Sequence, residues 1–217
     1  VIQGETGCGK SSQVPQFLLE DAGDAQGDQA NILVTQPRRV AAVALATRVA
    51  EERNEAVGGT VGYVTGKERC TSRKTRLTFV TMGWLLTWMS HNKGSLCRYS
   101  HIVLDEVHER TCDSDLTCLM LRLFMEQYME QCKTVQSGAA KPTFPRLVIM
   151  SATVDADLFA DYFGAIPGVP RPTPIKVGAK RFPVKEVHLE ELIGIWSTGE
   201  HGLHAMPSAR LEQFAKT

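Results

Sequence analysis

The eight residues GETGCGKS, from Gly4 to Ser11, are the feature of this sequence that most restricts its fold. They fit the pattern G-x-x-x-x-G-K-[ST], in which backbone amides and the start of a helix surround phosphate groups. The glycines allow a close approach that a Cβ would prevent, Lys10 can reach the β- and γ-phosphates, and Ser11 can offer its hydroxyl to Mg²⁺. A chance match in a chain of this length has odds on the order of one in a hundred. A glycine-rich turn before a helix is therefore the weaker alternative.

A second signal is an apolar strand that ends in two acids, Ile102-Val103-Leu104-Asp105-Glu106. Ligands of open α/β sheets bind at the carboxyl ends of the strands, which is where this pair would lie. Asp105 would hold Mg²⁺, usually through water, and Glu106 would orient or deprotonate the water that attacks the γ-phosphate. The alternative is a solvated pair of acids at a strand end. The phosphate-binding pattern disfavours it, because bound nucleotide requires an acidic metal partner.

Short β-rich runs alternate with helical stretches along the chain, a pattern typical of a parallel sheet with crossover helices. We therefore predict an α/β fold of the P-loop NTPase type, with a mostly parallel sheet and helices on both faces. The predicted strands are Val1-Ile2, Ile32 to Thr35, Thr60 to Tyr63, Leu77 to Thr81, Ile102 to Asp105 and Leu147 to Ser151. The predicted helices are Lys10 to Glu20, Val40 to Arg53, Met82 to Met89 and Leu116 to Gln131, where apolar residues recur at three- and four-residue spacings.

The composition excludes several classes of protein. Lys plus Arg and Asp plus Glu both number 24, so any nucleic-acid site must be local rather than a chain-wide basic surface. The apolar runs, such as Val40 to Ala46, are far shorter than the roughly 20 residues that cross a bilayer. Six cysteines without a C-x-x-C pair favour reduced thiols. We expect a soluble intracellular protein, with nucleus and cytoplasm both open.

The ends of the chain suggest a piece of a longer protein. It begins at Val1-Ile2, two residues of what should be a whole strand, and after Ile166 it becomes proline-rich, as in a linker that leaves a domain. We predict a domain over residues 1–183 and a linker over 184–217, with a strand-like run from Val184 to Leu189. Asp21 to Gln29 and Gln136 to Pro145 are predicted surface loops, because they are polar and rich in small residues or proline.

Four further motifs follow the phosphate loop along the chain. They are Thr35-Gln36-Pro37-Arg38-Arg39-Val40-Ala41-Ala42, Thr81-Met82-Gly83-Trp84-Leu85-Leu86, Asp105-Glu106-Val107-His108-Glu109-Arg110 and Ser151-Ala152-Thr153. With these motifs in this order, residues 1 to about 190 resemble the first RecA-like domain of a DEAH-box (DEAH/RHA family) ATP-dependent RNA helicase. His108 and the Gln-Pro-Arg-Arg string distinguish that family from its DEAD-box relatives, and DEVH here replaces DEAH.

The resemblance implies a role in ATP hydrolysis for particular residues. Those that would bind ATP, or another NTP, are Gly4, Glu5, Thr6, Gly7, Cys8, Gly9, Lys10 and Ser11, with Arg48 stacking on the base. Ser11 and Asp105 would hold the Mg²⁺. The catalytic residues would be Lys10, Asp105, Glu106 and His108, and the residues that couple hydrolysis to domain movement would be His108, Ser151 and Thr153.

The resemblance also implies an RNA partner, either a single strand or a duplex with an overhang. Arg38, Arg39, Thr81 and Gly83 match positions that contact the sugar-phosphate backbone. A second RecA-like domain and C-terminal domains of the parent chain would complete the enzyme, and the fragment alone should hydrolyse ATP poorly.

The chain departs from the family at a few positions. Gly66 stands where a hairpin arginine is usual, with Lys67 and Arg69 nearby, and Met82, Trp84 and Thr87 replace the common residues of the fourth motif. These departures motivate a rival hypothesis, a nucleic-acid-binding scaffold that keeps the phosphate loop without productive turnover. A GTPase or small-molecule kinase is a remote third, because Asn92-Lys93-Gly94-Ser95 lacks the Asp of the base-reading N-K-x-D.

Overall fold

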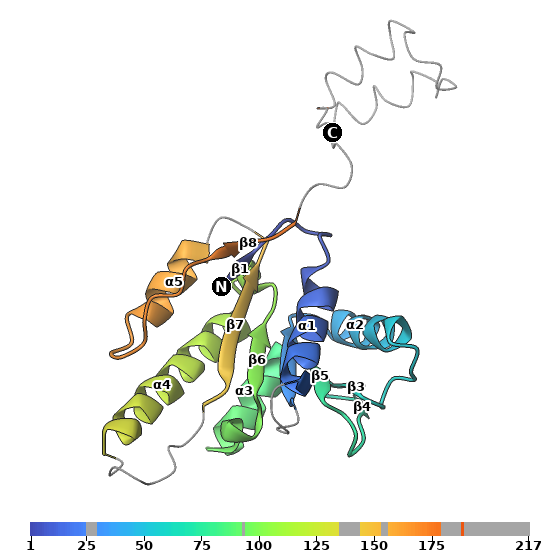
Figure 1. The fold of residues 1–217 in the computed structure, drawn as a ribbon, viewed down its shortest axis with the longest axis horizontal. Helices are drawn as coiled ribbons and strands as arrows, with labels where there is room; N and C mark the ends of the chain where they lie inside the picture. Colours follow the sequence, from blue (N-terminus) through green and yellow to red (C-terminus); the bar gives the residue numbers. More distant parts are fainter. Residues whose placement is uncertain (25–29, 93, 135–143, 153–155, 179–187, 189–217) are drawn as a thin grey trace, which may run out of the picture. The chain divides into compact units, whose positions relative to one another are not determined.

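A twisted, mostly parallel sheet forms the centre of the structure (Figure 1). In the computed structural model, residues 1–24, 30–92, 94–134, 144–152, 156–178 and 188 are described, and all of these except 188 belong to the unit Val1–Ala179. Within these residues the sheet has eight strands in the order β4-β3-β5-β2-β6-β7-β1-β8. Every neighbouring pair is parallel except β3 and β4. The predicted α/β fold with a mostly parallel sheet is confirmed.

The strands and helices alternate in sequence. The strands are β1 (Ile2–Gln3), β2 (Ile32–Gln36), β3 (Val61–Val64), β4 (Arg69–Cys70), β5 (Leu77–Thr81), β6 (His101–Leu104), β7 (Arg146–Ser151) and β8 (Ile175–Lys176). The α-helices are α1 (Lys10–Asp24), α2 (Arg39–Glu52), α3 (Met82–His91), α4 (Cys112–Thr134) and α5 (Ala156–Gly164). Two short 3₁₀ helices, η1 (Ser95–Arg98) and η2 (Val107–Glu109), flank β6.

Helices cover both faces of the sheet because successive strand residues point to opposite sides. In β2, Ile32 and Val34 pack with buried residues of α1 and α2, whereas Leu33 packs with those of α3, α4 and α5. In β6, Val103 lies on the first side and Leu104 on the second. These strand side chains are all fully buried, as expected for central parallel strands that are covered on both faces.

The longest described helix is α4, with 23 residues. Cys118 and Leu121 face the core, and Asp113 and Asp115 in its first turn complement the positive end of the helix dipole. Charged residues interrupt its apolar stretches. Among the residues that the structure describes, no helix is both long and apolar enough to cross a bilayer.

The structure corrects several sequence predictions. Asp21–Asp24 is not a loop, because α1 continues to Asp24, and α4 begins at Cys112 rather than Leu116. The segment after Ile166 does not leave the domain at once, since β8 returns to pair with β1. The predicted loop from Gln136 lies almost entirely outside the described residues, as does the predicted strand from Val184 apart from His188.

Candidate nucleotide-binding site

The phosphate-loop sequence forms the connection between β1 and α1 (Figure 1). Gly7 and Gly9 have φ of 83° and 91°, angles that other residues rarely adopt. The Gly4 N–H donates to the carbonyl of Ser151, 3.1 Å away, which ties the start of the loop to the end of β7. The helix begins at Lys10, so its free amides point into the loop.

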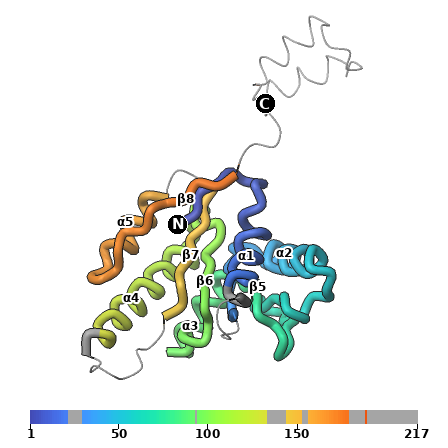
Figure 2. The backbone as a smooth tube through the Cα atoms, in the orientation of Figure 1, coloured from blue at the N-terminus to red at the C-terminus, as the bar shows by residue number. Residues whose placement is uncertain are grey.

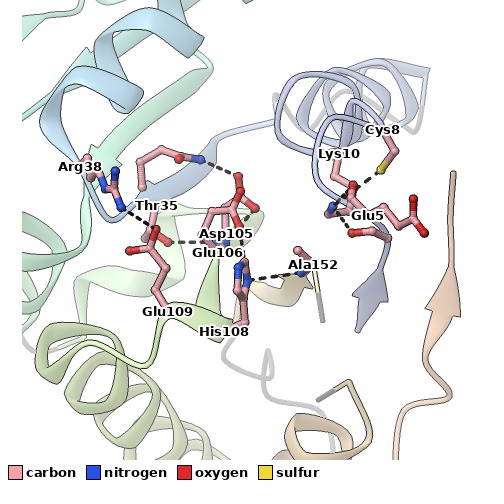
Figure 3. Close-up of polar contacts among 12 residues, drawn as sticks. Glu5, Cys8, Lys10, Thr35, Arg38, Asp105, Glu106, His108, Glu109 and Ala152 are labelled. Atoms are coloured by element: carbon pink, nitrogen blue, oxygen red, sulfur yellow. Dashed lines mark hydrogen bonds and ion pairs between the residues drawn. The ribbon is translucent and has the colours of Figure 1, made fainter. Parts of the chain in front are cut away.

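Lys10 is buried, with 6% of its surface exposed, and its ammonium group lies inside the loop (Figure 3). Nζ donates to the carbonyl oxygens of Gly4 and Glu5, the latter at 3.0 Å, and lies 3.7 Å from Sγ of Cys8. These bonds hold a positive charge among the backbone amides that the motif requires. The arrangement fits the binding of a polyphosphate.

Asp105 follows β6 and is fully buried. Its carboxylate accepts hydrogen bonds from Nε2 of Gln36 at 2.6 Å and from the backbone N–H of Glu106 at 2.9 Å. Burial raises the pKa of Asp105, and the nearby side chain of Ser11, these two hydrogen bonds and the charge of Lys10 oppose that rise. The phosphate loop and the acidic pair therefore lie close together, as the sequence predicted.

Glu106 occupies a strained backbone position beside Asp105, with φ of 54° and ψ of 34°. Its side chain is 27% exposed, so one end of the carboxylate can reach water. Burial raises the pKa of Glu106, the charge of Asp105 raises it further, and the charges of His108 and Lys10 lower it. A raised pKa makes this carboxylate a stronger base for a water proton.

His108 connects the loops that follow β6 and β7 (Figure 3). Its Nδ1 lies 3.3 Å from the Ala152 N–H, which donates to it, and also 3.3 Å from Oε2 of Glu106. One nitrogen cannot both accept from the amide and donate to the carboxylate, so the two contacts are alternatives. Ser151 is buried at the end of β7, and Thr153, the remaining predicted coupling residue, lies outside the described residues.

The residues present fit Mg²⁺ with a nucleotide. The side chain of Ser11 lies close enough to the carboxylate of Asp105 to lower its pKa, so the oxygens of both can reach one cation. Mg²⁺ takes oxygen ligands and is usually held by one or two carboxylates together with substrate phosphates. The described residues contain no group of three or more His, Cys, Asp or Glu that could hold a metal by themselves. The site is suited to a cation that arrives with its phosphates.

Arg48, the predicted base-stacking residue, lies on the exposed face of α2. Its Nε donates to Oε1 of Glu52 at 2.9 Å, while Oε2 of Glu52 accepts from Gln13 at 3.0 Å and Gln16 at 2.8 Å. Since both glutamines belong to the first two turns of α1, Arg48 is held close to the helix that follows the phosphate loop.

The predicted RNA-contacting residues follow β2 and β5, which are neighbours in the sheet. Arg38 and Arg39 are exposed, and Arg38 forms a 3.5 Å ion pair with Glu109. Thr81 is only 9% exposed, and a Cβ on Gly83 would lie 2.7 Å from Oδ2 of Asp113. The four residues therefore lie at the same carboxyl edge of the sheet as the phosphate loop.

Two of the unusual residues have a structural explanation. Met82 is 2% exposed and belongs to the core, and Trp84 stacks on Trp88 with ring centroids 6.1 Å apart. Gly66 is exposed in the turn between β3 and β4, and a Cβ there would meet nothing within 4 Å, so no steric reason requires glycine.

Two residues of the site received no role from the sequence. Gln36 donates to Asp105, and Ala152 donates to His108. The position of Gln36 at the end of a buried strand was a signal, because a polar side chain there points at the ligand edge of the sheet. Ala152 acts only through its backbone, which no residue type reveals.

Comparisons with known proteins agree with this geometry. The sequence model of the DEAD/DEAH box helicase family matches residues 1–160. The chain is 45% identical over 168 residues to the probable ATP-dependent RNA helicase spindle-E of Anopheles gambiae, which covers 77% of this chain and 10% of that protein. It is 41% identical over 196 residues to the putative ATP-dependent RNA helicase DHX57 of Homo sapiens, covering 90% of this chain and 13% of that protein.

A plant relative matches a comparable share of the chain. Identity to the DExH-box ATP-dependent RNA helicase DExH1 of Arabidopsis thaliana is 38% over 194 residues, or 89% of this chain and 17% of that protein. The chain thus spans between 10% and 17% of the length of these three relatives. The family model covers well over half of the chain, and the chain therefore belongs to the DEAD/DEAH box helicase family.

Proposed function

We propose that this chain is the ATP-binding motor domain of an ATP-dependent RNA helicase, which couples NTP hydrolysis to movement along RNA or to its unwinding. The observation that carries the proposal is that the phosphate loop, tied to the end of β7 by the Gly4–Ser151 bond, lies beside the buried carboxylate of Asp105 at the end of the neighbouring strand β6. Ser11 and Lys10 of the loop are close enough to this carboxylate to lower its pKa. Family membership and the names of the relatives support the same activity.

Each residue of the site has a role in this proposal. Lys10 and the loop amides bind the phosphates, and Ser11 and Asp105 would hold Mg²⁺, which would supply charge neutralisation at the phosphates. Glu106 lies beside Asp105, partly open to water, and takes a proton from the attacking water. His108 lies between this carboxylate and the Ala152 amide at the end of β7, and its Nδ1 can bond to one of the two at a time.

RNA is the proposed partner of the neighbouring carboxyl edge. Arg38 and Arg39 are exposed at the end of β2 and can contact phosphates of a single strand without reading its sequence. We further propose that a second RecA-like domain and C-terminal domains of the parent protein complete the enzyme, and that it works inside the cell.

The test is RNA-stimulated ATPase in the full-length protein with Lys10→Ala and Glu106→Gln. Lys10→Ala should lose nucleotide binding, whereas Glu106→Gln should bind ATP and lose turnover by about 10²- to 10⁴-fold, the usual contribution of a general base. Glu68→Gln, at an exposed position of the β3–β4 turn, is the matched control and should keep turnover.

Unchanged turnover in either site variant would refute the assignment. Wild-type protein that binds ATP and RNA without RNA-stimulated turnover would instead favour the scaffold hypothesis, which the exposed Gly66 and the altered fourth motif motivate.

A further inference from the structure

The last strand of the domain lies directly against the phosphate loop. β8 lies alongside the N-terminal segment of the chain (Figure 2). It pairs in parallel with β1, with Ile175 beside Ile2 and Lys176 beside Gln3. The Val177 N–H extends this pairing, because it donates to the carbonyl of Gln3 at 2.8 Å. The residues that follow β8 therefore come next to Gly4, the first residue of the loop.

The two segments approach so closely that neither Gly4 nor Gly178 can be replaced by a larger residue without a shift of the backbone. A Cβ on Gly4 would lie 2.6 Å from the carbonyl oxygen of Val177 and 2.9 Å from its Cγ2. A Cβ on Gly178, whose φ is 92°, would lie 2.7 Å from Cβ of Cys8. Cβ atoms essentially never lie within 3.0 Å of another heavy atom, so a substitution at either glycine must displace the loop or the segment after β8.

Cys8 fills the notch between these two glycines. Its Sγ lies 3.1 Å from the Cβ position of Gly4 and 3.2 Å from that of Gly178. On its other side the same sulfur lies 3.7 Å from Nζ of Lys10. The side chain at this variable position of the motif thus touches the start of the loop, the end of β8 and the phosphate-binding lysine.

We propose that Val177 and Gly178 are positioning residues for nucleotide binding: they form the outer wall of the notch that holds Cys8, and so fix the loop around Lys10. The inference rests on the proposed nucleotide-binding function of the loop. Gly7 and Gly9 lack side chains that could hold the loop in place, so packing of Cys8 against the distant segment supplies part of that order. Val177 and Gly178 act through Cys8 and do not themselves touch the nucleotide.

The experiment measures the Kd of a fluorescent ATP analogue with Mg²⁺, together with the thermal midpoint, in the intact protein. Gly178→Ala should raise the Kd by roughly 10- to 100-fold, the loss expected when a remote change misplaces a binding group by about 1 Å. Val177→Ala, which removes the side chain that packs against Gly4, should raise the Kd by a smaller factor and leave the fold intact. Ile175→Ala is the matched control, because its side chain is 59% exposed on the same strand, and should leave the Kd unchanged.

A second-site variant separates loop positioning from backbone strain at residue 178. Cys8→Gly removes the atoms that an alanine at 178 would strike, so the double variant should bind within about threefold of Cys8→Gly alone, a non-additive result. Additive losses in the double variant would overturn the proposal, as would an unchanged Kd in Gly178→Ala when the wild type binds nucleotide. Wild-type protein that binds no nucleotide would instead refute the proposed function itself.

Discussion

Replacing Gln36 with leucine should destabilise the protein through the carboxylate of Asp105. The Gln36 amide donates to Oδ2 of Asp105 at 2.6 Å, and the two side chains are 2% and 0% exposed. Leucine has a similar volume, so the main change is a buried carboxylate oxygen that has lost its donor. A hydrogen bond to a charged group is worth about 1.5–3 kcal/mol. For a domain of this size the midpoint of thermal unfolding should therefore fall by about 3–12 °C at pH 8.

The loss of stability in Gln36→Leu should depend on pH in a defined direction. Burial holds the pKa of Asp105 above its ordinary value, so the folded state binds more protons than the unfolded state between the two values, and stability falls as pH rises through that window. The amide of Gln36 opposes this shift, so removing it raises the folded pKa further. The destabilisation should be full at high pH and should shrink as the pH falls through the raised pKa of Asp105, where the carboxyl becomes protonated.

Gln16→Leu is the matched control for this experiment. Its amide also donates to a carboxylate, Oε2 of Glu52 at 2.8 Å, but Glu52 is exposed and has other donors. Water can replace the lost bond there, so the cost should stay below about 1 kcal/mol and vary little with pH. Equal losses in the two variants, or a Gln36→Leu loss that does not shrink as the pH is lowered from 8, would refute the reasoning.

Three further predictions follow from other parts of the fold. Leu121→Ala should cost about 2–5 kcal/mol in urea unfolding because Leu121 is fully buried, whereas Leu119→Ala, 44% exposed on the same helix, should cost less than about 1 kcal/mol. Burial lowers the pKa of His101, so the unfolded state binds more protons near pH 6; stability should fall as pH drops from 7.5 to 5.5, and less steeply in His101→Gln. Arg38→Ala should weaken RNA binding and reduce its salt dependence by about one phosphate contact, with unchanged thermal unfolding because its side chain is 78% exposed.

The predicted strands lie close to the observed ones because buried parallel strands leave a strong local signal. β2 runs Ile32–Gln36 where Ile32 to Thr35 was predicted, and β5 matches Leu77 to Thr81. In both, continuous apolar and β-branched residues determine the assignment without help from distant parts of the chain.

Elements that depend on distant partners escaped prediction. β8 has two residues, both exposed, and it exists because its backbone pairs with β1, far away in sequence. No alternation of apolar and polar residues marks such a strand.

α5 was also missed, although its local signal is helical. Its buried residues, Ala156, Phe159, Ala160 and Phe163, are spaced so that they lie on one face of a helix.

The same distinction applies to the candidate site. The loop and the acidic pair are contiguous motifs, and the sequence placed them together. Asp105 accepts hydrogen bonds from Gln36 at the end of β2 and from the amide of its neighbour Glu106, and it lies near Ser11 at the start of α1. Only the order of strands in the sheet brings Gln36 and Ser11 to this carboxylate.

That convergence has a physical consequence for how the site works. When a hydrogen-bond donor moves away from a buried carboxylate, the folded state is destabilised by about 1–3 kcal/mol or more. Displacing Ser11 therefore alters the free energy of a group that Gln36 also holds, and Gln36 lies two residues before the exposed Arg38. One structural path from the phosphate loop to the predicted RNA-contacting arginines thus runs through the buried side chain of Gln36. Because the Gln36 amide contacts Asp105 through a hydrogen bond, Gln36→Leu interrupts this path at a defined point.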